Sequence, residues 1–292
     1  MVTQARQEAR RDGGDHLAES VVHIATATDE AYLPYAAAMA WSLAACRDPD
    51  TELELTIMHA GVSAADQARL EAVIDGITVR WVSMHPDNYR RWGVEPEPLI
   101  LDPHYFRCLL ARIYPETVER AVYIDSDTVI LKDLRPLWSW PLNGNPIAAV
   151  GDLVSVISDA ISHWQEIGLD PDAPYFNAGV MVIDLARWRA ENIGEQVMRQ
   201  CQENRHRLLI QNRWNQHDQY GFNVVLQHRW TALPSGWNHY AERALDDVGI
   251  VHFLGDMKPG APLALPECTE LFIQAVDATQ WAGWRPPGNT TT

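Results

Sequence analysis

Short apolar runs alternate with longer alanine-rich or amphipathic stretches in the first third of the chain. The runs are rich in β-branched residues and predict strands over residues 21–27, 53–59 and 78–82. Residues 35–45 are rich in alanine and predict a helix between the first two strands. Ser63, followed by Asp66, predicts a capped helix over 63–74. Strands and helices alternating in this order predict a parallel sheet with helices on both faces.

The same alternation continues through the rest of the chain. Helices are predicted over residues 103–113, 185–204 and 218–226. Further strands are predicted up to Asp125 and over residues 147–150 and 179–183. Neither an internal repeat nor a linker is evident, so we expect one α/β domain over residues 21–284, with a Rossmann-like, mostly parallel central sheet. Residues 1–20 and 285–292 are polar and predict a disordered leader and tail.

One predicted strand ends in two acids, because Val122-Tyr123-Ile124 is followed directly by Asp125-Ser126-Asp127. Buried strands do not normally end in paired carboxylates without a cation. The carboxyl ends of strands in open α/β sheets face the crevice where ligands bind. Hard oxygen donors in that crevice suit Mg²⁺ or Mn²⁺, held jointly with a substrate diphosphate. The alternative is a solvated loop with a helix-capping aspartate.

Charge and cysteine content restrict the class of partner. The net charge is −16, which argues against binding to nucleic acid, whose phosphates require basic patches. No apolar run approaches the roughly 20 residues of a membrane span, and the first 20 residues lack the apolar core of a signal peptide. Four scattered cysteines without a C-x-x-C pair predict free thiols. We therefore expect a cytoplasmic protein without an integral membrane segment.

Four further segments place polar residues at the ends of predicted elements. They are Ala-Thr-Asp-Glu-Ala-Tyr at 27–32, Phe-Asn-Ala-Gly-Val at 176–180, Asp-Gln at 218–219 and His-Phe-Leu-Gly-Asp-Met-Lys-Pro at 252–259. Together with Asp-Ser-Asp, in this order and approximate spacing, they resemble the motifs of the family 8 retaining glycosyltransferases. The resemblance covers roughly residues 21–259 and implies the GT-A fold of that family.

The resemblance implies a role for each matching position. Asp125, Asp127 and His252 would bind Mn²⁺ or Mg²⁺, and the ion would bridge the phosphates of a UDP-sugar, UDP-glucose or UDP-galactose. Asp218 and Gln219 would lie beside the anomeric carbon on the β face of the sugar. The remaining donor contacts would come from Ala27, Asp29, Tyr32, Arg107, Asp125, Ser126, Asp152, Asn177, Ala178, Gly255 and Lys258. Of these, Asp29 and Tyr32 would meet uracil, and Lys258 would hold the diphosphate.

Residue types at these positions agree with glycosyl transfer. A cation and Lys258 stabilise negative charge on departing UDP, and a nearby carboxylate or amide oxygen stabilises the positive sugar. Gln219 is a poor nucleophile, and many relatives carry an acid where this chain has Tyr220. We therefore favour same-face attack, with a phosphate oxygen taking the acceptor proton. Relatives often have tryptophan at the position of Gly260, so the resemblance does not define a lid over the acceptor side.

Each of these residues also has a purely structural interpretation. His252 suits a half-buried histidine, Asp218 a helix N-cap and Asn177 a partner for loop backbone. The same interpretation makes Lys258 a solvated lysine and Tyr32 a packing residue.

Two other functions remain as alternatives. A nucleotidyltransferase usually has a glycine-rich, basic loop after the first strand, and residues 25–29 are neither. A non-catalytic sugar- or nucleotide-binding protein would be favoured by loss of the acids, the histidine or the lysine, and all are present. The acceptor is expected to be a hydroxyl of a soluble small molecule, glycan or polypeptide. No feature of the sequence indicates an oligomeric state.

Overall fold

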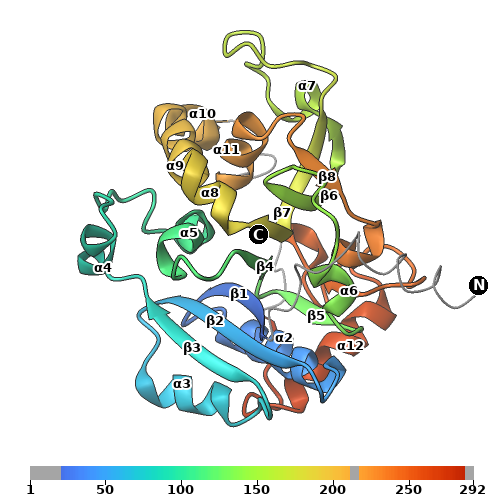
Figure 1. Ribbon diagram of the computed structural model, residues 1–292. Helices are drawn as coiled ribbons and strands as arrows, with labels where there is room; N and C mark the ends of the chain where they lie inside the picture. The colour runs from blue at the N-terminus through green and yellow to red at the C-terminus, as the bar shows by residue number, and fades with distance from the viewer. Residues whose placement is uncertain (1–20, 211–216, 287–292) are drawn as a thin grey trace, which may run out of the picture.

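The computed structural model describes residues 21–210 and 217–286, apart from the side chains of residues 209 and 210 (Figure 1). The predicted leader, and the predicted tail from residue 287 onward, lie outside these ranges. The larger sheet contains seven strands in the order β3-β2-β1-β4-β7-β6-β8. Their bounds are β1 Val21–Asp29, β2 Glu52–Ala60, β3 Thr78–Ser83, β4 Arg120–Ile124, β6 Ile147–Val156, β7 Pro174–Asp184 and β8 Trp230–Ala232.

The predicted α/β class and mostly parallel sheet are confirmed, with one reversal. Strands β1, β2, β3 and β4 pair in parallel, and so do β6 and β8. Strand β7 runs antiparallel to both of its neighbours, β4 and β6. The carboxyl ends of β1, β4 and β6 therefore meet the amino-terminal half of β7 at one edge of the sheet.

Helices cover both faces of this sheet, as predicted. The main helices are α2 Leu33–Cys46, α3 Ala64–Glu71, α8 Leu185–Glu191, α9 Ile193–Glu203, α11 His217–Val225 and α12 Pro266–Asp277. Shorter ones are α4 Pro86–Arg91, α5 Leu110–Ile113, α6 Arg135–Trp138, α7 Ile157–Ala160, α10 Arg205–Ile210 and the 3₁₀ helices η1 Pro103–Leu109, η2 Ser235–Asn238 and η3 Gly255–Met257. Figure 1 shows α8–α11 gathered beside β7, and α2 and α3 against the sheet of β1–β3.

Alternate residues of one strand belong to different cores. Val122 of β4 packs in the core under α2 and α3, whereas Tyr123 packs with η1, α8, α9 and α11. Because both faces are buried, the central strands are apolar throughout rather than alternating. A fully buried side chain such as Ile124 contributes about 1.5–3 kcal/mol of transfer free energy. This explains why the apolar runs predicted the strands well.

Two predicted helices are interrupted. The helix predicted over 185–204 is two helices, α8 and α9, which meet at Asn192 in the left-handed conformation with φ 52°. Asparagine tolerates that conformation better than most residues. The helix predicted over 103–113 begins as the 3₁₀ helix η1 and continues as α5. The predicted cap of α3 is confirmed, because the Ser63 hydroxyl accepts the Asp66 amide hydrogen at 3.1 Å.

A second, three-stranded sheet was not predicted from the sequence. It contains β5 Thr128–Ile130, β10 Ile250–His252 and β9 His239–Tyr240, in the order β5-β10-β9. His252 is paired with Thr128 across the antiparallel β5–β10 ladder. The amide of Phe253 donates to the carbonyl of Asp127 at 2.9 Å. This small sheet brings the carboxyl end of β10 against the acids that follow β4.

Two predictions from composition can be compared with the fold. All four cysteines lie within the described ranges, and each is a free thiol, as predicted. Across the part of the chain that the structure describes, none of the helices combines the length and apolar character needed to span a bilayer.

Candidate active site

A cavity of about 660 Å³ opens at the edge where β1, β4, β6 and the start of β7 meet. Its volume lies within the usual range of about 300–1,000 Å³ for ligand sites. Every site residue predicted from the sequence lines it: Ala27, Asp29, Tyr32, Arg107, Asp125, Ser126, Asp127, Asp152, Asn177, Ala178, Asp218, Gln219, His252, Gly255 and Lys258. The topology explains this, because three parallel strands end here and the antiparallel β7 begins here.

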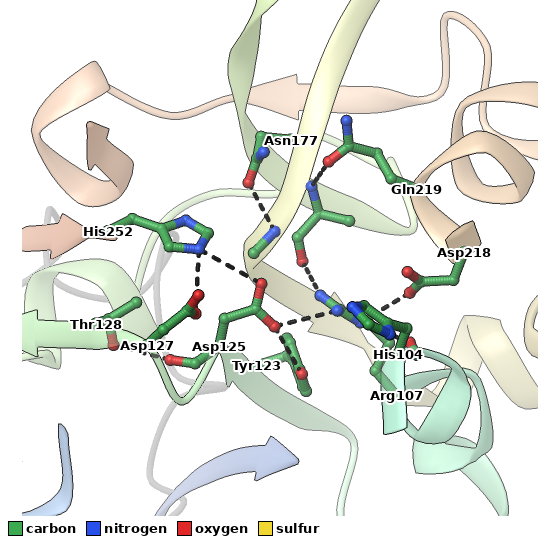
Figure 2. A network of polar contacts seen from close by, with 12 residues as sticks. His104, Arg107, Tyr123, Asp125, Asp127, Thr128, Asn177, Asp218, Gln219 and His252 are labelled. Atoms are coloured by element: carbon green, nitrogen blue, oxygen red, sulfur yellow. Dashed lines mark hydrogen bonds and ion pairs between the residues drawn. The ribbon is translucent and has the colours of Figure 1, made fainter. Parts of the chain in front are cut away.

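Two carboxylates and one imidazole converge on one side of the cavity (Figure 2). Nε2 of His252 lies 3.3 Å from Oδ1 of Asp127 and 3.7 Å from Oδ2 of Asp125. One ligand atom of each residue lies within 4.8 Å of the other two. Carboxylate oxygens with one imidazole suit a divalent ion such as Mn²⁺ or Mg²⁺. The donor set therefore fits the ion that the acid pair predicted.

A second group of possible ligands, Asp102, His104 and His217, lines the same cavity. The imidazoles of His104 and His217 are stacked, with centroids 4.0 Å apart and planes inclined by 11°. The lone pair of an imidazole nitrogen lies in the plane of its ring. In two stacked rings the lone pairs therefore lie in parallel planes and do not point at one common metal ion. Nδ1 of His104 lies 2.5 Å from Asp102, which raises the pKa of His104 although burial alone would lower it. This group forms a polar wall and lacks the geometry of a metal site.

Lys258 lies beside the acid pair and contacts Asp127 directly. Its ammonium also lies 5.0 Å from the ring centre of Tyr32 and 5.1 Å from that of Tyr35. Burial alone would lower the pKa of Lys258, but Asp127 outweighs burial and raises it. Burial alone would raise the pKa of Asp127, but Lys258 and His252 outweigh it and lower it. This end of the cavity therefore holds a fixed positive charge where a diphosphate could bind.

A buried guanidinium separates the acid pair from a third carboxylate. Arg107 is 4% exposed, and its side chain lies 3.1 Å from Oδ1 of Asp125 and 2.8 Å from Oδ2 of Asp218. It also donates to the carbonyl of Ala178 at 2.6 Å and lies 4.3 Å from the ring centre of Tyr123. Figure 2 shows Arg107 between the two carboxylates. The guanidinium thus connects the possible metal ligands with the opposite side of the cavity.

Asp218 lies in the first turn of α11 and is 2% exposed. Burial raises its pKa to about 6, although Arg107 lowers it. Its carboxylate pairs with Arg107, so the side chain of Asp218 points along the cavity wall at this guanidinium.

Amide groups line the cavity beside Asp218. Oε1 of Gln219 accepts the amide hydrogen of Ala178 at 3.0 Å, and Nε2 of Gln219 donates to Asp152 at 3.1 Å. The same oxygen of Asp152 accepts a hydrogen bond from Asn177 at 3.0 Å. The carboxamide of Gln219 is therefore held in one orientation beside the backbone of Ala178. Such a wall presents fixed polar atoms to the interior of the cavity.

The loop after β1 forms the other end of the cavity. Asp29 accepts the amide hydrogen of Tyr32 at 2.9 Å, which closes a tight turn. Tyr32 is 39% exposed, and its ring centre lies 5.1 Å from that of Tyr35. Gly255 has φ 50°, a conformation that glycine adopts without strain, at the start of η3. The exposed ring and the tight turn leave a flat aromatic face at this end.

Asp102, His104 and His217 were not identified as site residues from the sequence, and neither were three residues that contact the possible metal ligands. The hydroxyl of Tyr123 donates to Asp125 at 2.9 Å. Oδ1 of Asn238 lies 2.8 Å from Nδ1 of His252. A Cβ placed on Gly179 would lie 2.3 Å from Cε1 of His252, so only glycine leaves room for the ring. Nothing in the local sequence distinguishes Asn238, whereas Gly179 lies inside a motif that was singled out for other residues.

One family model matches most of the chain. Residues 23–261 match the family model described as glycosyl transferase family 8. General stress protein A of Bacillus subtilis is 26% identical over 286 residues, covering 90% of this chain and 96% of that protein. A probable galacturonosyltransferase-like protein of Arabidopsis thaliana is 25% identical over 271 residues, covering 82% of this chain and 71% of that protein.

A solved structure shares the fold. The galactosyltransferase LgtC, crystallised with donor and acceptor sugar analogues, matches with a TM-score of 0.68 and 22% identity. The match covers 91% of this chain and 98% of that one.

Proposed function

Because the chain belongs to glycosyl transferase family 8 and is a glycosyltransferase of the GT-A fold, we propose that it transfers a hexose from a UDP-sugar to a hydroxyl acceptor. The UDP-sugar would be UDP-glucose or UDP-galactose, and the configuration of the sugar would be retained. The observation that carries the proposal is the order of groups along the cavity. The ammonium of Lys258 lies 5.0 Å from the ring centre of Tyr32 and contacts Asp127. Arg107 then links Asp125 to Asp218, which precedes Gln219 in the chain. The nucleoside, the diphosphate and the sugar of a UDP-sugar would need partners of these kinds in this order.

The diphosphate would lie beside Lys258 and the three possible metal ligands, Asp125, Asp127 and His252. A divalent ion, when bound, would neutralise charge on the diphosphate and on the departing UDP. Lys258 contributes a fixed positive charge at the same place, and its raised pKa keeps it charged at neutral pH. Ser126 and the backbone at Gly255 complete this part of the proposed donor site.

The sugar would lie against the wall formed by Asp152, Asn177, Ala178, Asp218 and Gln219. Positive charge that develops on the sugar would be stabilised by the Asp218 carboxylate and by the amide oxygen of Gln219. Because Oε1 of Gln219 already accepts a hydrogen bond from Ala178, it is held in place rather than free to act as a nucleophile. This supports same-face attack: the bond from the anomeric carbon to the phosphate oxygen breaks and the bond to the acceptor oxygen forms. The acceptor proton passes to the departing phosphate oxygen.

Ala27 and Asp29 would contact uracil, and Tyr32 would stack on it. Arg107 would support donor binding by pairing with both Asp125 and Asp218, which fixes the positions of the two carboxylates. Four free thiols support action in the reducing cytoplasm. A soluble small molecule, glycan or polypeptide is proposed as the acceptor, and no role in binding nucleic acid is proposed because the chain is acidic.

UDP release from a panel of nucleotide sugars tests the donor and the metal together. The panel includes UDP-glucose, UDP-galactose and UDP-galacturonate, each with Mn²⁺, Mg²⁺ or EDTA, and compares wild type with Asp125→Ala. We expect slow hydrolysis of one UDP-hexose that is lost with EDTA and in the variant. Turnover of UDP-galacturonate alone would overturn the hexose assignment. Absence of turnover and of metal-dependent UDP binding would overturn the proposal as a whole.

A further inference from the structure

A chain of buried side chains joins His252 to the opposite wall of the cavity. Nδ1 of His252 lies 2.8 Å from Oδ1 of Asn238, and Nδ2 of Asn238 donates to Oδ1 of Asn177 at 2.8 Å. Nδ2 of Asn177 donates in turn to Asp152 at 3.0 Å, and Asp152 also accepts from Gln219. Asn238 is 2% exposed and is not among the residues that line the cavity. It therefore contacts the site only through other side chains.

The direction of every hydrogen bond in this chain follows from its fixed members. The backbone amide of Gly179 can only donate, and it donates to Oδ1 of Asn177 at 2.9 Å. The Asp152 carboxylate, which faces Nδ2 of Asn177, can only accept. The contacts with Gly179 and with Asp152 therefore require the same orientation of the Asn177 side-chain amide. Oδ1 of Asn177 must then accept from Asn238, which leaves the oxygen of Asn238 facing the ring. Nδ1 of His252 must therefore carry the hydrogen.

In the neutral ring, this direction leaves the other nitrogen, Nε2, with a lone pair. Nε2 of His252 faces Asp127 at 3.3 Å and Asp125 at 3.7 Å. A histidine that binds a metal does so through such a nitrogen, and a hydrogen bond from its other nitrogen fixes the tautomer and the ring orientation. The ring has little other freedom, because Gly179 packs directly against it.

We infer that Asn238 is a positioning residue, which holds the His252 ring as the tautomer whose Nε2 lone pair points at the metal site. The inference rests on the proposed function, since the ion is part of that proposal. Asn238 also ties His252 to Asn177, and hence to Asp152 and Gln219. The metal ligand and the proposed sugar-binding wall are thus held as one hydrogen-bonded unit.

Binding of Mn²⁺ in the presence of UDP, followed by electron paramagnetic resonance of free Mn²⁺, measures this role without turnover. We expect Asn238→Ala to weaken Mn²⁺ binding by about 10–100-fold, as for other residues that orient metal-binding histidines. In a His252→Ala background the same substitution should have no further effect. A purely structural asparagine would weaken binding by the same factor in both backgrounds, and that result would overturn the inference.

A matched control is available in Asn145, which donates to the Thr231 hydroxyl at 3.0 Å and does not line the cavity. Asn145→Ala should leave Mn²⁺ binding unchanged. Unaltered Mn²⁺ binding by Asn238→Ala, with a wild type that binds normally, would refute the role of Asn238 alone. A wild type that binds no Mn²⁺ would instead refute the proposed function.

Nitrogen-15 NMR of histidine-labelled wild type tests the tautomer directly, even if Asn238→Ala does not fold. Spectra are recorded at pH 8 without metal and again with Mg²⁺ and UDP, and His252 is assigned from His252→Ala. We expect the hydrogen on Nδ1 in both states. A hydrogen on Nε2 with none on Nδ1 in the metal-free protein would contradict the direction of the hydrogen bonds and overturn the inference whatever the metal result.

Discussion

The guanidinium of Arg107 lies 2.8 Å from the carboxylate of Asp218, and only 4% and 2% of the two residues are exposed. The same guanidinium lies 3.1 Å from Asp125, so one buried cation serves two carboxylates from distant parts of the chain. Removing one partner from a buried ion pair costs about 3–5 kcal/mol, because the other charge is left without compensation. Arg107 is therefore expected to matter for folding as well as for donor binding.

Arg107→Gln should lower the free energy of unfolding by about 3–5 kcal/mol at pH 7, measured by urea denaturation. The deficit should shrink as the pH falls, because an unpaired, buried Asp218 takes up a proton in the folded state. Arg285→Gln is the control, since it removes an exposed ion pair with Asp277 and should hardly change the midpoint. A variant as stable as wild type would show that Asp218 and Asp125 do not need this cation.

The pH dependence of turnover should report on Asp218. Burial raises the pKa of its carboxyl from 3.8 to about 6, and Arg107 reduces this shift. The charged form predominates above pH 6, so kcat/KM for the UDP-hexose should fall as the pH drops through about 6. Asp218→Asn cannot titrate, and its residual hydrolysis should lack this inflection. An inflection that persists in the variant would assign the titration to another group.

Gly179→Ala should disturb the metal site more than its size suggests. The added Cβ would lie 2.3 Å from Cε1 of His252 and 2.9 Å from Oδ1 of Asn177, so the ring or the strand must move. We expect a clear loss of thermal stability and at least a tenfold weaker affinity for Mn²⁺. Gly151→Ala is a matched strand control, because its Cβ would meet only the carbonyl of Tyr175 at 3.9 Å. Normal Mn²⁺ affinity in Gly179→Ala would contradict the requirement for glycine.

Tyr32 should affect nucleotide binding but not the chemical step. Stacking of a base on an aromatic ring is worth about 1–3 kcal/mol. Tyr32→Ala should therefore raise the KM for the UDP-sugar roughly 5–150-fold with little change in kcat. Tyr32→Phe retains the ring and should remain close to wild type in KM. Equal losses in both variants would indicate that the hydroxyl, and not the stacking face, is what matters.

The apolar strands and the acid pair were evident from the sequence because both depend on local constraints. A strand buried on both faces must be apolar along its whole length, and Val122 and Tyr123 follow this rule. The end of the strand can therefore be recognised in the sequence at Asp125, where the apolar run stops. The left-handed Asn192, by contrast, divided a predicted helix, because helical periodicity alone does not show a single reversed residue.

Amino-acid sequence by itself identified the acid pair, His252, Lys258 and Asp218 as charged candidates, because they lie beside the ends of predicted elements, but it did not identify Asp102, His104 and His217. Only the tertiary structure decided how they are oriented. The antiparallel direction of β7 and the small sheet of β5, β10 and β9 are set by pairing between distant segments, which leaves no local pattern. For the same reason, Asn238 and the close packing of Gly179 on His252 emerged only in the folded protein. Their importance depends on contacts between segments that lie far apart in the chain.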